Sequence, residues 1–418
     1  MNNVPYLRDY LLYSEGNEAP TMFHVWGAFV TVSAAISRKV WLPNGKFLLW
    51  PNIYVMYVGS AGNGKSFAMR HVTTLLKRLD RIPISKSVET VEGLLRFMGG
   101  DPPVGDKPGR EYEFKFVTKG PTGAMVEVNP MTIVANEYID FISKNPDGWT
   151  NLLTNIYDED NYSYGTKNQG QDILSNPYMV LLGALTTEVS SDLHKQRIIS
   201  TGLARRTFFQ YGERQFDNPH SEPTATPEQL SAQNRCLEHL KLLRSVSGEM
   251  GRSDYTRAWY KEWYNAHNLE VPKKAPQVQG WFASKPDQVL KLGMLLALME
   301  ETPSMEVRVD HLQIALDYLE LLEKDLFKVF GGVGRNEVAE IAIKIRTFLE
   351  HQKCAVTQQK MWALFFADCK TKEELDMALQ FLVEDAQIFE TYVAVGSTTV
   401  KVYAASQETL KKLKNPEG

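Results

Sequence analysis

The residues from Gly59 to Ser66, GSAGNGKS, constrain the fold of this chain more than any other segment, because they match the pattern G-x-x-x-x-G-K-S. An apolar run from Ile53 to Val58 precedes them and an amphipathic stretch follows. Gly59, Gly62 and Gly64 allow backbone conformations in which successive amides face one anion, and the N-terminus of the next helix attracts the same charge. The segment therefore predicts a strand, a phosphate-binding loop and a helix, in that order.

Two side chains of this loop suit a nucleoside triphosphate that carries Mg²⁺. Lys65 would neutralise the β and γ phosphates, and the Ser66 hydroxyl would bind the metal ion. A glycine-rich turn without a ligand would not require both residues. We therefore expect nucleotide binding at this loop.

Two further apolar segments, Met131–Ile142 and Tyr178–Glu188, are predicted to contain strands. Buried apolar strands separated by helices are typical of an α/β fold with a parallel sheet covered on both faces. Ligands of such sheets bind at the carboxyl ends of the strands. Because Gly59, Glu137 and Thr186 all fall at such ends, we expect them at one edge of the sheet.

Hydrolysis of a γ-phosphate needs a carboxylate near the attacking water. Glu137 is the predicted carboxylate, although an ordinary surface acid at a strand end is the simpler alternative. Asn136 stands where an aspartate usually holds the water shell of the metal, which predicts weaker metal binding or the help of another acid. Thr186 or Thr187 would orient the water or contact the γ-phosphate, but either hydroxyl could instead cap the next helix.

Three basic residues are candidates for binding phosphate outside this loop. Arg205 and Arg206 lie between a predicted helix and an apolar strand, so one could pair locally while the other reaches the nucleotide of a neighbouring subunit. A surface salt bridge is an equally open interpretation for each arginine. Lys167 lies at the tip of a predicted hairpin in residues 161–173, where it could hold a phosphate or be an ordinary solvated turn lysine.

Changes in composition divide the chain into a sequence of predicted parts. These are an N-terminal arm (1–20), an α/β core (21–215), a polar linker with a helical lid (216–330), a glycine hinge (331–334), a winged-helix domain (336–406) and a tail (407–418). A second hairpin, near residues 111–128, is predicted to be inserted in the core. Thr371–Glu390 holds one lysine against six acidic residues, so the winged-helix part is expected to bind protein rather than read DNA.

The formal net charge of −4 gives no global basic signature, so any contact with nucleic acid must come from a local patch or from loops that line a pore. The three cysteines are far apart in sequence and lack metal-ligand spacing, which favours a reduced cytoplasmic compartment. No stretch reaches the roughly 20 apolar residues that span a bilayer. We expect a soluble protein without a signal peptide or a membrane partner.

Taken together, GSAGNGKS, IVANE, LLGALTTE, GLARR, the hairpin with Lys167 and the segment Ala283–Leu298 resemble a family of helicase-like, primase-associated ATPases of phages and mobile elements. The same order of parts is similar to a minimal form of the minichromosome-maintenance helicases. Those proteins are AAA+ rings with a presensor hairpin, an arginine finger, a helical lid and a C-terminal winged helix. The resemblance covers about residues 20–405.

The resemblance implies a role for each matching residue. ATP and Mg²⁺ would bind at Lys65 and Ser66, with Glu137 as the catalytic acid and Thr186 as a sensor. Arg205 would be a finger that acts in a neighbouring subunit, and Lys167 would contact DNA. Lys285, in the lid, would take a sensor position that is usually held by arginine. The implied assembly is a ring, expected to be a hexamer, on single-stranded DNA in the host cytoplasm, with a primase or polymerase as a further partner. Asn136, Lys285 and the lack of an N-terminal DNA-binding domain depart from the helicase pattern.

Two hypotheses about function follow. The first is an ATP-driven motor of phage or mobile-element replication, which Lys167 and the paired arginines favour. The second is an ATP-dependent switch with slow hydrolysis, such as a helicase loader, which Asn136 and the acidic winged helix favour. A signalling ATPase would need an effector domain, and the sequence shows no nuclease or protease constellation.

Overall fold

The computed structural model describes most of the chain. The described residues are 4–85, 90–99, 115–143, 145–166, 170–186, 202–215, 225–274, 276–326, 329, 337–352, 354–366, 368–369, 371–384, 387–395 and 398–414. The chain forms two compact units, Met1–Val333 and Gly334–Gly418, and the boundary between them falls in the glycine-rich stretch predicted as a hinge. That stretch, like Lys167 and Thr187, lies outside the described residues.

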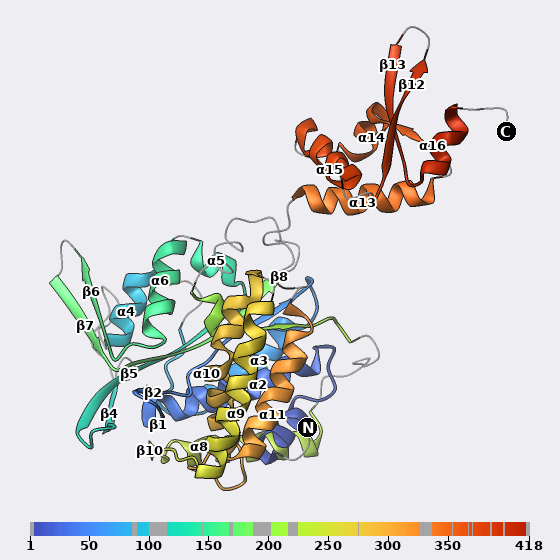
Figure 1. Ribbon diagram of the computed structural model, residues 1–418. Helices are drawn as coiled ribbons and strands as arrows, with labels where there is room; N and C mark the ends of the chain where they lie inside the picture. The colour runs from blue at the N-terminus through green and yellow to red at the C-terminus, as the bar shows by residue number, and fades with distance from the viewer. Residues whose placement is uncertain are drawn as a thin grey trace. The chain divides into compact units, whose positions relative to one another are not determined.

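The first unit is built on a mixed five-stranded sheet in the order β4-β5-β8-β3-β9 (Figure 1). Its strands are β4 (Phe116–Lys119), β5 (Met125–Ala135), β8 (Pro177–Thr186), β3 (Tyr54–Gly59) and β9 (Thr207–Tyr211). The pairs β5·β8, β8·β3 and β3·β9 are parallel, and β4 is antiparallel to β5. The predicted α/β class with a largely parallel sheet is therefore confirmed.

Helices cover both faces of this sheet. Along β3, Tyr54 donates from its hydroxyl to Leu153 O of α6 (Pro146–Ile156) at 3.0 Å. Tyr57, three residues along the same strand, donates to Phe23 O of α2 (Thr21–Ile36) at 2.5 Å. Because side chains alternate along a strand, α6 and α2 lie on opposite faces. This double cover explains why all six residues of β3 are buried.

The N-terminal residues form a packed helix, so the prediction of an arm at residues 1–20 was wrong. In α1 (Pro5–Tyr13), Tyr6, Leu7 and Tyr10 are buried, and their spacing places them on one face. Asp9 accepts two bonds of 3.0 Å from Arg235 of α8 (Pro227–Leu243), which fixes α1 against the helical part.

The helices predicted as a lid belong to the same compact unit as the sheet. They are α8, α9 (Asp254–Glu270), α10 (Pro276–Leu298) and α11 (Val309–Glu323). Apolar residues of α10 such as Leu290, Leu295 and Leu296 are fully buried, and α10 packs along α11 (Figure 1). A small sheet of β1 (Val40–Asn44), β2 (Phe47–Leu49) and β10 (Gly248–Glu249) joins this helical part to the segment before β3.

Two hairpins extend from the same side of this unit (Figure 1). One is β4 with the start of β5, as predicted for residues 111–128, and the other is β6 (Asn161–Thr166) with β7 (Gly170–Ser175). The predicted hairpin in residues 161–173 is therefore confirmed. The remaining short elements are η1 (Ser37–Lys39), α4 (Val91–Gly99), α5 (Tyr138–Ile142), η4 (Ala204–Arg206) and η5 (Val271–Lys273).

The second unit contains helices followed by a hairpin, in the order predicted. Its elements are α13 (Glu337–His351), β11 (Val356–Thr357), α14 (Gln358–Phe365), α15 (Lys372–Glu384), β12 (Phe389–Val395), β13 (Thr398–Ala404) and α16 (Gln407–Lys414). Ile345, Leu379 and Ile388 are fully buried in its core. The segment predicted as a tail forms α16, because Leu410 packs with Val402 and Ala404.

No helix within the described ranges is both long and apolar enough to cross a bilayer.

Candidate functional site

The glycine loop, residues Gly59–Ser66, connects β3 to α3 (Lys65–Leu76). Gly62 and Gly64 have φ values of +76° and +85°, a region that favours glycine. Gly64 is the N-cap of α3, and its carbonyl accepts the first helical hydrogen bond from Ala68 N at 3.0 Å. The amides of the first turn therefore lack helical acceptors and are available to an anion.

The Lys65 ammonium is folded back over the glycine loop. It donates to Gly59 O at 2.7 Å, to Ser60 O at 2.7 Å and to Asn63 Oδ1 at 2.9 Å. All three acceptors belong to the loop, so the positive charge is held at its centre. Ser66, the next residue, is exposed at the start of α3.

Asn63 anchors the loop to the end of β9, although the pattern leaves its position unspecified. Its Nδ2 donates to Gly212 O at 2.7 Å. A Cβ on Gly59 would lie 2.0 Å from Asn63 Nδ2 and 2.4 Å from Gly212 O. Gly59 is therefore needed for this close approach and Gly62 for its φ angle, while Gly64 combines a positive φ with a close neighbour.

Gly62 and Gly64 offer a matched pair of substitutions. A Cβ on Gly62 would meet no atom within 4 Å, whereas a Cβ on Gly64 would lie 2.7 Å from both Cα and Cβ of Ala19. We expect Gly62→Ala to lower the free energy of unfolding by about 1 kcal/mol through φ alone. Gly64→Ala should cost roughly 1–3 kcal/mol more, because Ala19 must move. Urea unfolding of both variants tests this, and equal losses would contradict the contact with Ala19.

The register of the sheet brings three predicted residues to the edge where β3 ends. Gly59 pairs with Thr186, the last residue of β8, and Ala135 of β5 pairs with Gly183 of the same strand. Asn136 and Glu137 follow Ala135 directly and are exposed at the same edge. Thr186 therefore lies between the start of the glycine loop and the Asn136–Glu137 pair.

Glu137 shares this edge with a second acid, Asp140. A hydrogen bond that the Asp140 carboxylate accepts from protonated Glu137 raises the pKa of Glu137 above its usual value, and the negative charge of Asp140 adds to the increase. The two acids lie three residues apart at the start of α5, where one helical turn brings them together. Asp140 was not singled out from sequence, although its spacing from Glu137 was visible. Asp140 is a candidate for the additional acid that Asn136 predicts.

Arg205 and Arg206 lie at the opposite edge of the sheet. They end η4, directly before Thr207, which pairs with Tyr54 at the start of β3. Arg206 is engaged within the chain: its Nε and Nη2 donate to Asp158 Oδ2 at 3.0 and 2.7 Å, and its Nη1 donates to Gly202 O. Arg205 is exposed, and no described residue accepts a bond from its guanidinium. The structure thus distinguishes two arginines that the sequence left equivalent.

Lys285 lies on the same side as Arg205, away from the glycine loop of its own chain. It belongs to α10, where Gln288 Nε2 donates to Arg205 O at 2.7 Å. The Lys285 side chain is buried, and its ammonium pairs with Glu323 of α11. This ion pair links α10 to α11, a role for Lys285 that the sequence did not indicate.

No protein-family model matches this chain, and no curated protein matches its sequence. Function is therefore inferred from the geometry of the chain itself. At one edge of the sheet, the glycine loop, Thr186, Glu137 and Asp140 combine amides, a lysine, hydroxyls and carboxylates. The loop amides and Lys65 are donors available to an anion, and Ser66 and the two acids offer oxygen atoms of the kind that bind divalent cations.

Proposed function

We propose that this protein is an ATP-dependent oligomeric helicase or translocase that acts on single-stranded DNA in phage or mobile-element replication. The observation that carries the proposal is the register of β3, β8 and β5. It places Lys65, Thr186 and Glu137 at one edge, while Arg205 lies at the other. ATP would bind at the glycine loop of one subunit, with Arg205 supplied by the next subunit.

The first edge supports hydrolysis. Lys65 would exchange its loop acceptors for β and γ phosphate oxygens, and Ser66 would bind Mg²⁺. Glu137 would orient and deprotonate the attacking water, with Asp140 holding its pKa nearer to neutrality. Thr186, between them, would contact the γ-phosphate.

The second edge supports an assembly. Five residue steps of β3 separate Tyr54 from Gly59, about 17 Å at the usual rise of a strand. Because Arg205 directly precedes the residues that pair with the Tyr54 end of β3, it would act on the nucleotide of a neighbouring copy rather than on that of its own subunit. A heterologous contact of this kind closes into a ring when its rotation permits, and a hexamer is the expected form.

The two hairpins on one side of the unit would follow the DNA strand. The β4–β5 hairpin carries exposed Val117 and Met125, and Lys167 follows β6 in the other hairpin. Exposed apolar side chains on one hairpin, together with a lysine in the sequence between β6 and β7, suit a contact to bases and phosphates without sequence preference. The acidic α15 of the second unit, proposed as a winged helix, would instead bind a primase, a polymerase or a neighbouring subunit.

The alternative, a helicase loader or initiation switch with slow hydrolysis, is favoured by Asn136 and by the acidic α15. Steady-state ATP hydrolysis with and without single-stranded DNA, measured together with the mass in solution with ATP, separates the two functions. The motor predicts an oligomer whose turnover rises on adding DNA. A monomer with slow turnover that DNA does not change would instead support the switch.

Arg205→Ala should leave ATP affinity unchanged and reduce turnover about 10³-fold, as expected when a finger that stabilises the transition state is lost. The matched change Arg206→Ala should instead lower the melting temperature, because it removes the bonds to Asp158. Mixing inactive Arg205→Ala subunits with inactive Lys65→Ala subunits should restore part of the turnover. Full hydrolysis by Arg205→Ala alone would contradict the assignment of the finger.

A further inference from the structure

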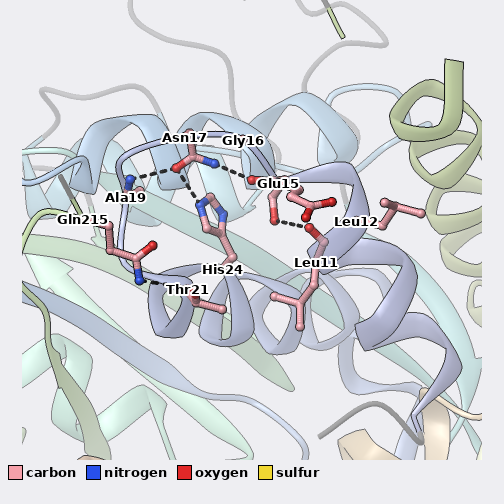
Figure 2. A pocket seen from close by; sticks show the side chains of 10 residues that line it. Leu11, Leu12, Glu15, Gly16, Asn17, Ala19, Thr21, His24 and Gln215 are labelled. Carbon is pink, nitrogen blue, oxygen red and sulfur yellow. Dashed lines mark hydrogen bonds between the residues drawn. The ribbon is translucent and has the colours of Figure 1, made fainter. Parts of the chain in front are cut away.

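The cavity shown in Figure 2 has a volume of about 420 Å³ and lies between the end of α1, the start of α2 and the segment after β9. Among its lining residues Glu15 is charged, and none is a lysine or an arginine. A strand of DNA needs cations near its phosphates, so this cavity does not suit it. Cations gather instead near the start of β4, away from the glycine loop.

Three cations from distant segments form what we call the basic cluster: Lys39 of η1, Arg81 after α3 and Arg244 at the end of α8. The Lys39 ammonium donates to Arg244 O at 2.5 Å. Burial and, to a smaller extent, the charge of Arg244 lower the pKa of Lys39 to about 8. Burial also lowers the pKa of Arg244; the charge of Asp80 opposes this change, and the charge of Arg81 adds to it. The three cations therefore lie close enough to repel one another, with Asp80 as a nearby acid.

Both guanidinium groups of the basic cluster are unpaired within the described part of the chain. Arg81 is exposed and Arg244 is half-buried, and no described residue accepts a hydrogen bond from either side chain. An anion could therefore approach both groups. Arginine suits this task because its planar fork can donate two parallel bonds to one phosphate.

Basic residues at the ends of α3 and α8 could serve only to offset the helix dipoles. The bond from Lys39 to the end of α8 fits that simpler explanation. Arg81 does not, because it lies beyond the last turn of α3, where the dipole has little effect. Its φ of +55° is also costly for a residue with a Cβ, and such strain is concentrated at functional sites.

The basic cluster borders the base of the β4–β5 hairpin. Lys39 Nζ lies 5.3 Å from the ring centroid of Phe116, the first residue of β4. Thr132 N of β5 donates to Pro83 O at 2.9 Å, so the segment after Arg81 runs beside β5. Because β8 occupies the other edge of β5, this segment lies at the same edge as β4. The three cations and the Phe116 ring therefore face one surface.

We propose that the basic cluster binds the phosphodiester backbone of single-stranded DNA at the base of the β4–β5 hairpin. This inference rests on the proposed function, which places DNA at the hairpins, and adds a phosphate-binding surface. Arg81 and Arg244 would each pair with a phosphate, and the Phe116 ring would lie beside a base. Lys39, Phe116 and Arg244 are half-buried, which suits a narrow strand better than a flat membrane surface.

The test measures the affinity of the full chain for a fluorescent oligothymidine by anisotropy, without nucleotide and at several salt concentrations. In the double variant Arg81→Asn/Arg244→Gln, the affinity should fall about 25-fold at about 0.1 M salt, because each phosphate contact on a single strand releases roughly 0.7 counterion. The slope of log K against log salt should become shallower by about 1.4. Asparagine tolerates a positive φ, so the backbone at position 81 is retained.

The matched control is the double variant Lys261→Ala/Lys324→Ala. It removes the same charge from exposed positions on α9 and at the end of α11. Its affinity for oligothymidine and its salt slope should equal those of the wild type. An equal loss in this control would show that net charge, rather than the basic cluster, determines binding.

The outcomes separate this surface from the proposed function. Wild-type turnover that DNA stimulates, together with full binding of oligothymidine by the Arg81→Asn/Arg244→Gln protein, would overturn the basic cluster alone. A wild type that binds no oligothymidine would overturn both the cluster and the motor. Binding of the wild type to phosphatidylserine vesicles but not to oligothymidine would identify a membrane surface and overturn the proposal. Should the double variant fail to fold, Arg81→Asn alone decides: a fall of about fivefold supports the cluster, and unchanged affinity overturns it.

Discussion

Replacing Lys65 with alanine is expected to weaken ATP binding by at least a hundredfold. The ammonium is the cation at the centre of the glycine loop, and it already donates three hydrogen bonds there at 2.7–2.9 Å. Bonds between a charged donor and phosphate contribute about 1.5–3 kcal/mol each, so the loss of two such bonds accounts for that factor. Titration calorimetry of the variant with ATP and Mg²⁺ gives the measurement.

Lys77→Ala is the matched control, because Lys77 is the exposed C-cap residue of the same helix and the net charge changes equally. Its ATP affinity should equal that of the wild type. Circular dichroism and thermal melting of both variants show whether the fold is retained. A folded Lys65→Ala protein with unchanged affinity would contradict a phosphate site at this loop.

Glu137→Gln should lower steady-state turnover by about 10²–10⁴-fold while ATP still binds, since a positioned general base contributes that much. The amide retains the size of the side chain but cannot accept the proton of the attacking water. Glu127→Gln is a suitable control, because Glu127 lies on β5 far from the carboxyl edge and should be dispensable for hydrolysis. A Glu137→Gln protein with normal turnover would indicate another base.

Asp140→Asn tests the link between the two acids through the pH profile. In the wild type the Asp140 carboxyl raises the pKa of Glu137, so the base becomes active only as pH rises through that raised value. Removing the acid lowers the pKa of Glu137, and the acidic limb of turnover should move to lower pH. An unchanged acidic limb would show that Asp140 does not act through Glu137.

Local patterns predicted the elements that depend on nearby residues. The strand, loop and helix around Gly59–Ser66 follow from glycine spacing and apolar runs, and so does the β6–β7 hairpin. The same is true of the edge formed by Gly59, Thr186 and Glu137, because carboxyl ends of parallel strands always meet.

The remaining features depend on contacts between distant segments. Asn63 donates a hydrogen bond to Gly212, and Gly64 lies close to Ala19. Neither contact can be predicted from the residues around its two partners. The ion pair of Lys285 depends on which helix packs against α10, and the hydrophobic periodicity of α10 does not reveal that neighbour. The helix α1 was missed because its four buried residues include an aspartate, Asp9, and lie in a segment of only nine residues that begins with a proline, so the helical pattern is weak.

The hydrogen bond from Asn63 to Gly212 has a consequence for co-translational folding. The glycine loop is complete only when β9 has docked beside β3, and the two partners of that bond are 149 residues apart in the chain. Contacts between residues so far apart in sequence form late in folding, because the chain must first lose the conformational entropy of the long loop between them. A nascent chain that stops short of Gly212 would contain all residues of Gly59–Ser66, but the glycine loop would lack the anchor that Gly212 provides. ATP binding would therefore have to wait for the synthesis of β9, well after the glycine loop itself has been made.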